Sequence, residues 1–306
     1  MLSLLKARAL HSIILIVAVV SVVFLTNFVI GDPVKILLPP STPPEAVELY
    51  RHNLGLDRPI LVQYFDFMKR AFTGDFGDSW WQKTPALPIA LRPFPATLEL
   101  GIVAMLFATL VGLTVGLYAS ARPRSLVDRI ATSISFLGIS SPLIWLALML
   151  ALIFSVKLGW FPTSGYGTLG HMVLPTVALA ALPLGRIVQI TRAAMLDELA
   201  KPYIVTARAK GLSEKKVFIK HALRNALPPI ITEVGWETAL LLTGYTIIVE
   251  SVYGWPGFGF ATYNAILTRD LPVITALAFV ASVVVVVINF LTDIAYWFAN
   301  PTIRLR

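Results

Sequence analysis

The side chains best suited to chemistry in this sequence gather in residues 201–229, within a chain that is otherwise mostly apolar. The stretch holds seven basic residues and one acid, Glu214. The basic residues are Lys201, Arg208, Lys210, Lys215, Lys216, Lys220 and Arg224. Long apolar runs flank the stretch on both sides, so we interpret it as a cytoplasmic docking segment between two membrane helices. We expect no covalent chemistry in this chain, and hence no enzyme activity.

Composition limits the class of protein. Of 306 residues, 57% are hydrophobic and 14% are charged, whereas a soluble domain is nearer half apolar and a quarter charged. The excess indicates a polytopic membrane protein. The net charge of +8 does not require nucleic acid, because Lys and Arg also accumulate in cytoplasmic loops of membrane proteins. Their placement in such loops here leads us to expect no nucleic-acid partner.

Cysteine and histidine usage excludes several kinds of site. The chain has no cysteine, so disulfides, thiolate nucleophiles and cysteine metal sites are excluded. Its four histidines are scattered without ligand spacing: His11, His52, His171 and His221. We therefore expect no bound metal.

Six apolar stretches are long enough to cross a bilayer, which takes roughly 20 residues at about 1.5 Å each. They cover residues 9–30, 97–121, 130–156, 171–195, 229–252 and 271–297. Gly31-Asp32-Pro33 ends the first, because proline cannot continue a helix and aspartate is costly in lipid. The sequence predicts an all-α polytopic membrane protein with six transmembrane helices.

Residues 31–95 differ from the rest of the chain. From residue 32 to 95, seven basic and seven acidic residues balance one another, among clustered prolines. Residues 44–54 and 60–72 have helical spacing, so we expect a small water-exposed subdomain and not a linker. The chain is then one domain, residues 1–306, with its first helix at 9–30, the subdomain at 31–95 and a five-helix core at 96–306 that includes the loop 197–228.

Orientation follows from the basic residues in short loops and at the ends. Fourteen lie on the side of the basic loop and both termini, whereas two, Lys157 and Arg269, lie on the other. Positive charge accumulates on the cytoplasmic side, so we expect both termini and the basic loop there. The subdomain is then on the outer face, since long loops translocate largely regardless of charge.

With this topology, several stretches resemble the inner-membrane permeases of bacterial ABC importers of the dipeptide/oligopeptide/nickel family. The matching stretches are GDP at 31–33, LGLDRPI at 54–60, GDFG at 74–77, TARAKGLS at 206–213, HALRNA at 221–226, WPGFG at 255–259 and NPTIR at 300–304. The outer subdomain looks like that of the B-type permease in a B/C pair. The resemblance covers nearly the whole chain, with its motifs in the expected order.

The resemblance implies partners and coupling residues. The partners are a paralogous C-type permease, two ABC ATPase subunits and an extracytoplasmic solute-binding protein, assembled in the bilayer of the bacterial cytoplasmic (inner) membrane. ATP and Mg would be bound by the ATPases; this chain has no G-x-x-x-x-G-K-[ST] phosphate loop, and we expect no cofactor in it. The residues implied to couple to the ATPases are Thr206, Ala207, Arg208, Ala209, Lys210, Gly211, Leu212 and Ser213.

The local pattern around Gly211 suits that role. Residues 207–209 are small or helix-favouring, Gly211 interrupts them, and Ser213 begins a second helix. A helix–Gly–helix element that projects from the membrane has a shape that fits a groove of a partner. The alternative is an ordinary basic loop held on anionic lipid headgroups.

Two acids lie inside the fifth predicted helix. Glu233 and Glu237 are four residues apart and share one helical face; similar permeases would have an apolar residue and a glutamine there. If that face lines the translocation pathway, it attracts cationic cargo. The alternative is pairing with Arg224 or Arg192 at the cytoplasmic interface. We interpret Arg186 and Arg192 as interface charges near the inner end of the fourth helix.

Two further patterns predict packing. Gly112 and Gly116 form a small-xxx-small pair, which favours close helix contact within the chain or with the second permease. Glu250 lies near the outer end of the fifth helix, where we expect a packing role, such as fixing the turn 255–259.

The resemblance leads us to expect an importer permease for di- or oligopeptides. Permeases for nickel, opines or glutathione-like compounds are similar, so these substrates stay open. A hypothesis of a different class is a stand-alone channel or ion-coupled carrier, which often has inverted repeats and broken helices. We find no internal repeat, and the ordered motifs argue against this second class.

Overall fold

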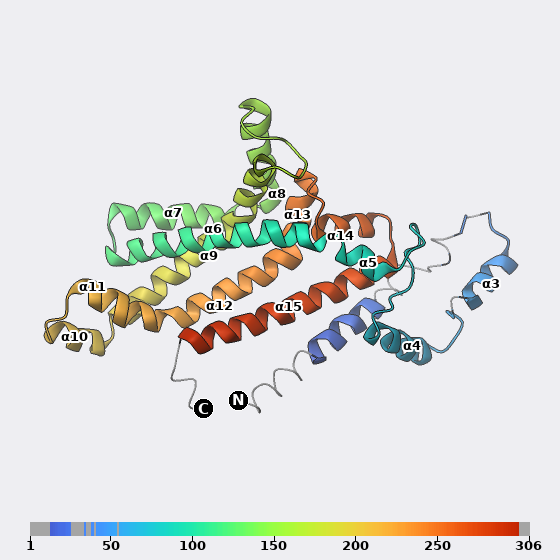
Figure 1. The fold of residues 1–306 in the computed structure, drawn as a ribbon, viewed down its shortest axis with the longest axis horizontal. Helices are drawn as coiled ribbons and strands as arrows, with labels where there is room; N and C mark the ends of the chain where they lie inside the picture. Colours follow the sequence, from blue (N-terminus) through green and yellow to red (C-terminus); the bar gives the residue numbers. More distant parts are fainter. Residues whose placement is uncertain (1–12, 26–33, 35–37, 40, 54, 300–306) are drawn as a thin grey trace. The chain divides into compact units, whose positions relative to one another are not determined.

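The structure, a computed structural model, describes residues 13–25, 34, 38–39, 41–53 and 55–299 (Figure 1). Within these residues it is helical, with no strand beyond an isolated bridge between Asp78 and Pro85. The all-α prediction is confirmed. The α-helices are α3 (Pro44–Asn53), α4 (Ile60–Phe72), α5 (Ala86–Leu91), α6 (Phe94–Ala121), α7 (Leu126–Ser140), α8 (Leu143–Leu150), α9 (Leu169–Leu199), α10 (Pro202–Ala209), α11 (Glu214–Lys216), α12 (Arg224–Leu240), α13 (Thr246–Tyr253), α14 (Phe258–Leu267) and α15 (Leu271–Ala299). Three π-helical segments join some of them: η1 (Ala151–Lys157), η2 (Val217–Leu223) and η3 (Leu241–Tyr245).

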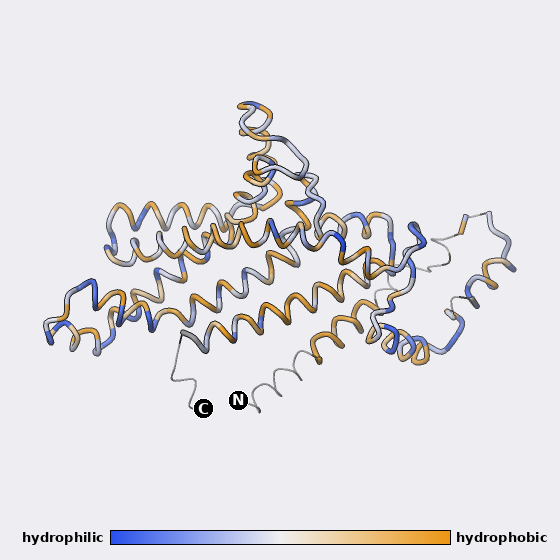
Figure 2. Tube along the Cα trace, in the orientation of Figure 1, coloured by the Kyte–Doolittle hydropathy of each residue, from blue (hydrophilic) through white to orange (hydrophobic). Residues whose placement is uncertain are grey.

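Three continuous helices in the described part are long and apolar enough to cross a membrane. They are Ala86–Ala121, Leu169–Leu199 and Leu271–Trp297, and they match the second, fourth and sixth predicted spans. Figure 2 shows apolar residues along most of α15. A shorter apolar helix, Ile13–Leu25, lies within the first predicted span, whose other residues are outside the described part. The number six stays a prediction.

The third predicted span is bent. The sequence predicts one helix over 130–156, but α7 ends at Ser140, α8 begins at Leu143, and the two meet at 104°. The cause is Pro142, because proline disfavours helical backbone in the residue before it. Ser141 is accordingly extended, with ψ at 125°. The pair α7 and α8–η1 is a fourth candidate span if the two arms are counted as one.

The fifth predicted span is a run of three elements. α12, η3 and α13 follow one another without interruption from Arg224 to Tyr253, so the helix begins before the predicted residue 229. The run carries Glu233, Glu237 and Glu250 and is not among the long apolar helices. π-Helical turns such as η3 are often found at functional sites.

Residues 1–95 and 260–286 form one compact unit. In it, Asp270 accepts a hydrogen bond from the Ser79 hydroxyl at 2.5 Å and one from the Trp80 backbone N–H at 3.2 Å. The Trp81 indole N–H donates to the Thr268 carbonyl at 2.8 Å. These bonds tie residues 79–81 to the turn before α15. The domain division expected from the sequence, with residues 260–286 in the five-helix core at 96–306, stays a prediction.

Both helices predicted inside the subdomain are confirmed as α3 and α4. α4 ends at Phe72 and is followed by Thr73 and Gly74, with Gly74 at a φ of +76°. Arg70 of α4 binds the Asp75 carboxylate through Nε at 2.9 Å. That guanidinium lowers the pKa of Asp75. Helix α14 was not predicted, because its ten residues lie in a stretch read as a loop.

The second compact unit, residues 96–259 and 287–306, is built around α9. α7, α8, α12 and α13 contact α9, and Figure 1 labels all five helices. Glycines allow these approaches: a Cβ on Gly185 would lie 2.6 Å from the Ser135 carbonyl, and one on Gly138 would lie 2.8 Å from the Ala181 carbonyl.

The small-residue pair on α6 also contacts α9. A Cβ on Gly112 would lie 2.9 Å from the Ile187 side chain, and one on Gly116 would lie 2.7 Å from Thr191. Any larger side chain would force the helices apart. The predicted close packing at Gly112 and Gly116 is confirmed within the chain.

Candidate functional site

The basic loop folds as a helix–Gly–helix element, as the sequence predicted. α10 begins at Pro202, whose fixed φ suits the first helical position. It ends at Ala209, and the second helix begins at Glu214 with Ser213 as its N-cap residue. The Ser213 side chain makes no capping bond, but its carbonyl accepts from Lys216 and Val217 N–H at 2.8 and 3.0 Å.

Gly211 sets the angle between the two helices. Its φ is +75°, in the left-handed region where residues with a Cβ are disfavoured. A Cβ placed on Gly211 would meet nothing within 4 Å among the described residues. The requirement for glycine is therefore a matter of backbone conformation and not of space.

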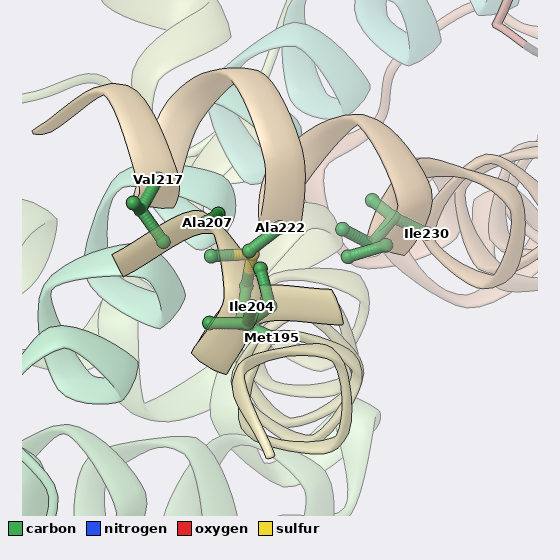
Figure 3. Packing of buried hydrophobic residues seen from close by; sticks show 7 residues of the cluster. Met195, Ile204, Ala207, Val217, Ala222 and Ile230 are labelled. Carbon is green, nitrogen blue, oxygen red and sulfur yellow. The ribbon is translucent and has the colours of Figure 1, made fainter. Parts of the chain in front are cut away.

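A buried apolar cluster holds the element onto the spans (Figure 3). Its members are Met195 from α9, Ile204 and Ala207 from α10, Val217 and Ala222 from η2, and Ala226 and Ile230 from α12. Met195, Ile204 and Val217 have no exposed surface. The cluster therefore joins α10 to both α9 and α12.

Polar bonds around Tyr203 reinforce the same junction. The Tyr203 hydroxyl donates to Glu198 at 2.6 Å and accepts from the Asn225 amide at 3.0 Å. Lys201 binds the other Glu198 oxygen at 2.5 Å. Burial, then the Glu198 carboxylate, raises the pKa of Tyr203. No local sequence pattern signals this network, since its members are spread over three helical elements.

The eight predicted coupling residues divide by burial into two packed residues, which belong to the base of the element, and six residues on its exposed face. Ala207 is a buried member of the cluster, and Leu212 is half-buried and packs against it. The other six are exposed: Thr206, Arg208, Ala209, Lys210, Gly211 and Ser213. Arg208 binds both Glu214 oxygens, at 2.9 and 3.1 Å. This exposed pair is worth about 0–1 kcal/mol, so it orients side chains more than it holds the fold. Figure 2 shows polar residues gathered around α10 and α11.

A second group of polar side chains lies between α9 and α12. Arg186 Nη1 binds Glu237 Oε1 at 2.5 Å; the Glu237 side chain is 0% exposed and that of Arg186 is 36% exposed. Glu237 Oε2 is buried without a hydrogen-bond partner in the described chain. The predicted partners of Glu237, Arg224 and Arg192, are therefore replaced by Arg186.

Glu233 lies one turn before Glu237 and is partly exposed. It acts electrostatically on both Arg186 and Glu237, so the three charges form one cluster. We refer to Arg186, Glu233 and Glu237 as the α9–α12 charge cluster. Assignment of Glu233 and Glu237 to a pathway stays a prediction.

Arg192 makes a second ion pair. Its Nε and Nη2 bind the two oxygens of the buried Asp128 at 2.5 and 2.9 Å. The backbone N–H of Arg124 also donates to Asp128, at 2.8 Å. Arg192 and Arg186 are thus fixed by buried acids, whereas the sequence interpretation treated both as interface charges.

Glu250 has the packing role that was expected. It is fully buried and accepts from the Thr97 hydroxyl at 2.6 Å, while Thr97 accepts from the Phe258 N–H at 2.7 Å. A Cβ on Gly257 would collide with the Glu250 carboxylate. Glu250 therefore fixes the turn 255–259. The role of Thr97 was not predicted, because a single threonine in a sequence does not indicate a buried hydrogen bond.

Family models match both parts of the chain. The model described as the binding-protein-dependent transport system inner membrane component matches residues 108–305. The model of the N-terminal membrane component of such systems matches residues 1–101.

Individual proteins are similar over nearly the full length. The chain is 36% identical over 313 residues to the di/tripeptide transport system permease DppB of Pseudomonas aeruginosa, with 92% of each chain covered. It is 37% identical over 293 residues to the glutathione transport system permease GsiC of Salmonella choleraesuis, covering 96% of this chain and 95% of that one.

Solved structures share the fold. An inward-facing MetNI methionine ABC transporter matches with a TM-score of 0.55 and 22% identity, over 69% of this chain and 96% of that chain. An amino acid ABC transporter matches with a TM-score of 0.54 and 18% identity, over 68% and 92%. At these identities the likeness concerns the fold alone.

Proposed function

Because the chain belongs to the permeases of the dipeptide/oligopeptide/nickel family of ABC importers, we propose that it forms part of a pathway for di- or oligopeptides. It is a membrane subunit of such an importer. Relatives named for di/tripeptide and for glutathione transport support a cargo that contains peptide bonds. A glutathione-like cargo is the second candidate, favoured by the identity to the GsiC permeases. Nickel and opines are less supported by these relatives.

The observation that carries the mechanism is the exposed helix–Gly–helix element on its buried base. Six of the eight residues from Thr206 to Ser213 are free to contact a partner, and the base connects them to α9 and α12. Two ATPase subunits dock on this element and on that of a paralogous C-type permease. ATP and Mg bind to the ATPases. Their closure moves α10, and the movement opens the pathway outward to receive peptide from a solute-binding protein.

The α9–α12 charge cluster is the part of the unit suited to the pathway. Charged groups inside a membrane usually face protein or water, and two members of the cluster, Glu233 and Arg186, are partly exposed. Glu233 and Glu237 give the cluster one more negative than positive charge, which favours the amino terminus of a peptide. A stand-alone carrier would not need the coupling element.

Purification of the tagged chain tests the assembly. In mild detergent, we expect a second permease and P-loop ATPases to co-purify and to be identified by mass spectrometry. Proteoliposomes of that complex, with the binding protein and ATP, should take up a labelled dipeptide such as L-Ala-L-Ala. A single species that survives gentle extraction, or a complex that takes up no peptide, would contradict the proposal.

We propose six spans, both termini in the cytoplasm and residues 31–95 outside. Because the chain has no cysteine, single cysteines can report this directly. Gln82→Cys and Lys215→Cys both lie at exposed positions. In spheroplasts, a membrane-impermeant maleimide should label the first variant and label the second only after permeabilisation. The opposite pattern would invert the topology.

A further inference from the structure

Arg186 lies deep along a membrane helix yet remains partly uncovered. It is 13 residues from the end of α9 at Leu199, or about 20 Å at 1.5 Å per residue. Its side chain is 36% exposed, although its partner Glu237 is 0% exposed. An exposed guanidinium at this depth is costly in lipid, so this surface faces water or protein.

Glu237 binds Arg186 but does not occupy all of its hydrogen-bond donors. A guanidinium has five N–H donors, and within the described chain Arg186 makes one hydrogen bond, from Nη1 to Glu237 Oε1. The other Glu237 oxygen stays buried without a partner, so the pair does not use the paired fork-to-carboxylate geometry. The remaining donors of Arg186 are left for another acceptor.

The surroundings of Arg186 are polar. Glu233 and Tyr245 both act on it electrostatically, and both are partly exposed. Tyr245 closes the π-helical segment η3, which begins four residues after Glu237. α9 also carries Pro183 one turn before Arg186. The cation of Arg186 and the anion of Glu233 thus lie close to irregular helix geometry, at η3 on one side and Pro183 on the other.

We propose that Arg186 binds the carboxylate of the cargo during passage, with Glu237 as the residue that positions it. The planar guanidinium of arginine fits the two oxygens of a carboxylate better than the ammonium group of lysine does. A charge-assisted hydrogen bond between these groups is strong. Free peptides carry this carboxylate, so the inference rests on the proposed peptide-import function. Glu233 lies on the same cluster and suits the ammonium group of the same molecule.

The test compares two cargoes in the reconstituted complex. L-Ala-L-Ala has the carboxylate, and its C-terminal amide lacks it. The variant is Arg186→Gln with Glu237→Gln, which removes both charges of the ion pair, so that neither partner is left charged without the other; Arg186→Lys keeps the cation. We expect the ratio of acid to amide uptake to fall about tenfold in the double variant, as for loss of one charge-assisted hydrogen bond, and to fall less in Arg186→Lys. Selection by the binding protein cancels, because the same protein serves every variant.

A second measurement varies the sign of the charge at position 186. The variant Arg186→Cys with Glu237→Gln can be modified with a cationic or an anionic methanethiosulfonate reagent, since the chain has no other cysteine. The cationic reagent should restore acid uptake, and the anionic reagent should not; unmodified wild-type complex treated in parallel is the control.

Each outcome decides a different point. If the wild-type complex takes up both cargoes and the acid-to-amide ratio is the same in the double variant, the carboxylate site is wrong and Arg186 instead serves the seam with the second permease. If the wild-type complex takes up neither cargo, the proposed peptide import fails, and this inference fails with it.

Discussion

Valine in place of Gly211 is expected to reduce peptide uptake about 5–30-fold while leaving the amount of permease in the membrane near the wild-type level. Gly211 has a φ of +75°, and a left-handed conformation costs a residue with a Cβ about 1–2 kcal/mol, which corresponds to that range. In the part of the chain that the structure describes, nothing lies within 4 Å of a Cβ there, so no clash disturbs the core. The strain is relieved by turning α10 relative to α11, which misplaces the exposed face. Uptake and ATP hydrolysis are measured on the same proteoliposomes.

Two variants control this prediction. Gly211→Asn should retain most uptake, because asparagine tolerates the left-handed region. Gly159 is the matched position: its φ is +64°, and a Cβ there also meets no described residue within 4 Å. Gly159→Val introduces similar strain outside the helix–Gly–helix element and should leave uptake close to normal. Unchanged uptake in Gly211→Val would mean that the angle between α10 and α11 does not serve coupling.

Helical periodicity, apolar length and the residues that mark helix ends predicted most of the described fold. Apolar length identified the helices that became α6, α9 and α15, and capping residues with periodicity identified α3 and α4. The bend between α7 and α8 was missed, although Pro142 was visible, because an apolar run of spanning length outweighed a single proline. The short α14 was missed because ten residues between turns carry too weak a period.

The candidate site shows a different limit. The element around Gly211 was predictable because its signals are local: small residues, a glycine and a helix-starting serine in sequence. Its base was not, since Met195, Ile204 and Ile230 meet only through the packing of four elements. Sequence singled out Glu237 as unusual but could not choose its partner. Arg186 is 51 residues away, and only the level at which α12 crosses α9 selects it over Arg192.

The ion pair between Arg186 and Glu237 should have the largest effect on folding, and its two halves should not be equivalent. Breaking a buried pair from one side costs about 3–5 kcal/mol. Arg186→Ala leaves a fully buried carboxylate unpaired, so we expect the upper end of that range. Glu237→Ala leaves a cation that is 36% exposed and can reach water or a partner chain, so we expect the lower end. Thermal unfolding in detergent and abundance in the membrane measure both.

The matched control is the other buried pair. Arg192→Ala leaves Asp128 with a remaining donor, the Arg124 N–H at 2.8 Å, whereas Glu237 has no second donor in the described chain. Arg192→Ala should therefore destabilise less than Arg186→Ala.

The double variant Arg186→Met with Glu237→Met separates stability from transport. Two apolar side chains of similar length remove both charges, so stability should return to near the wild-type level or above it. If the pair served only to hold α9 against α12, uptake would return as well. We expect stability to recover while uptake of L-Ala-L-Ala stays low, because the variant lacks the guanidinium proposed to bind the carboxylate of the cargo. Full recovery of both would make the pair a dispensable structural feature and would leave Glu233 as the only pathway charge of the cluster.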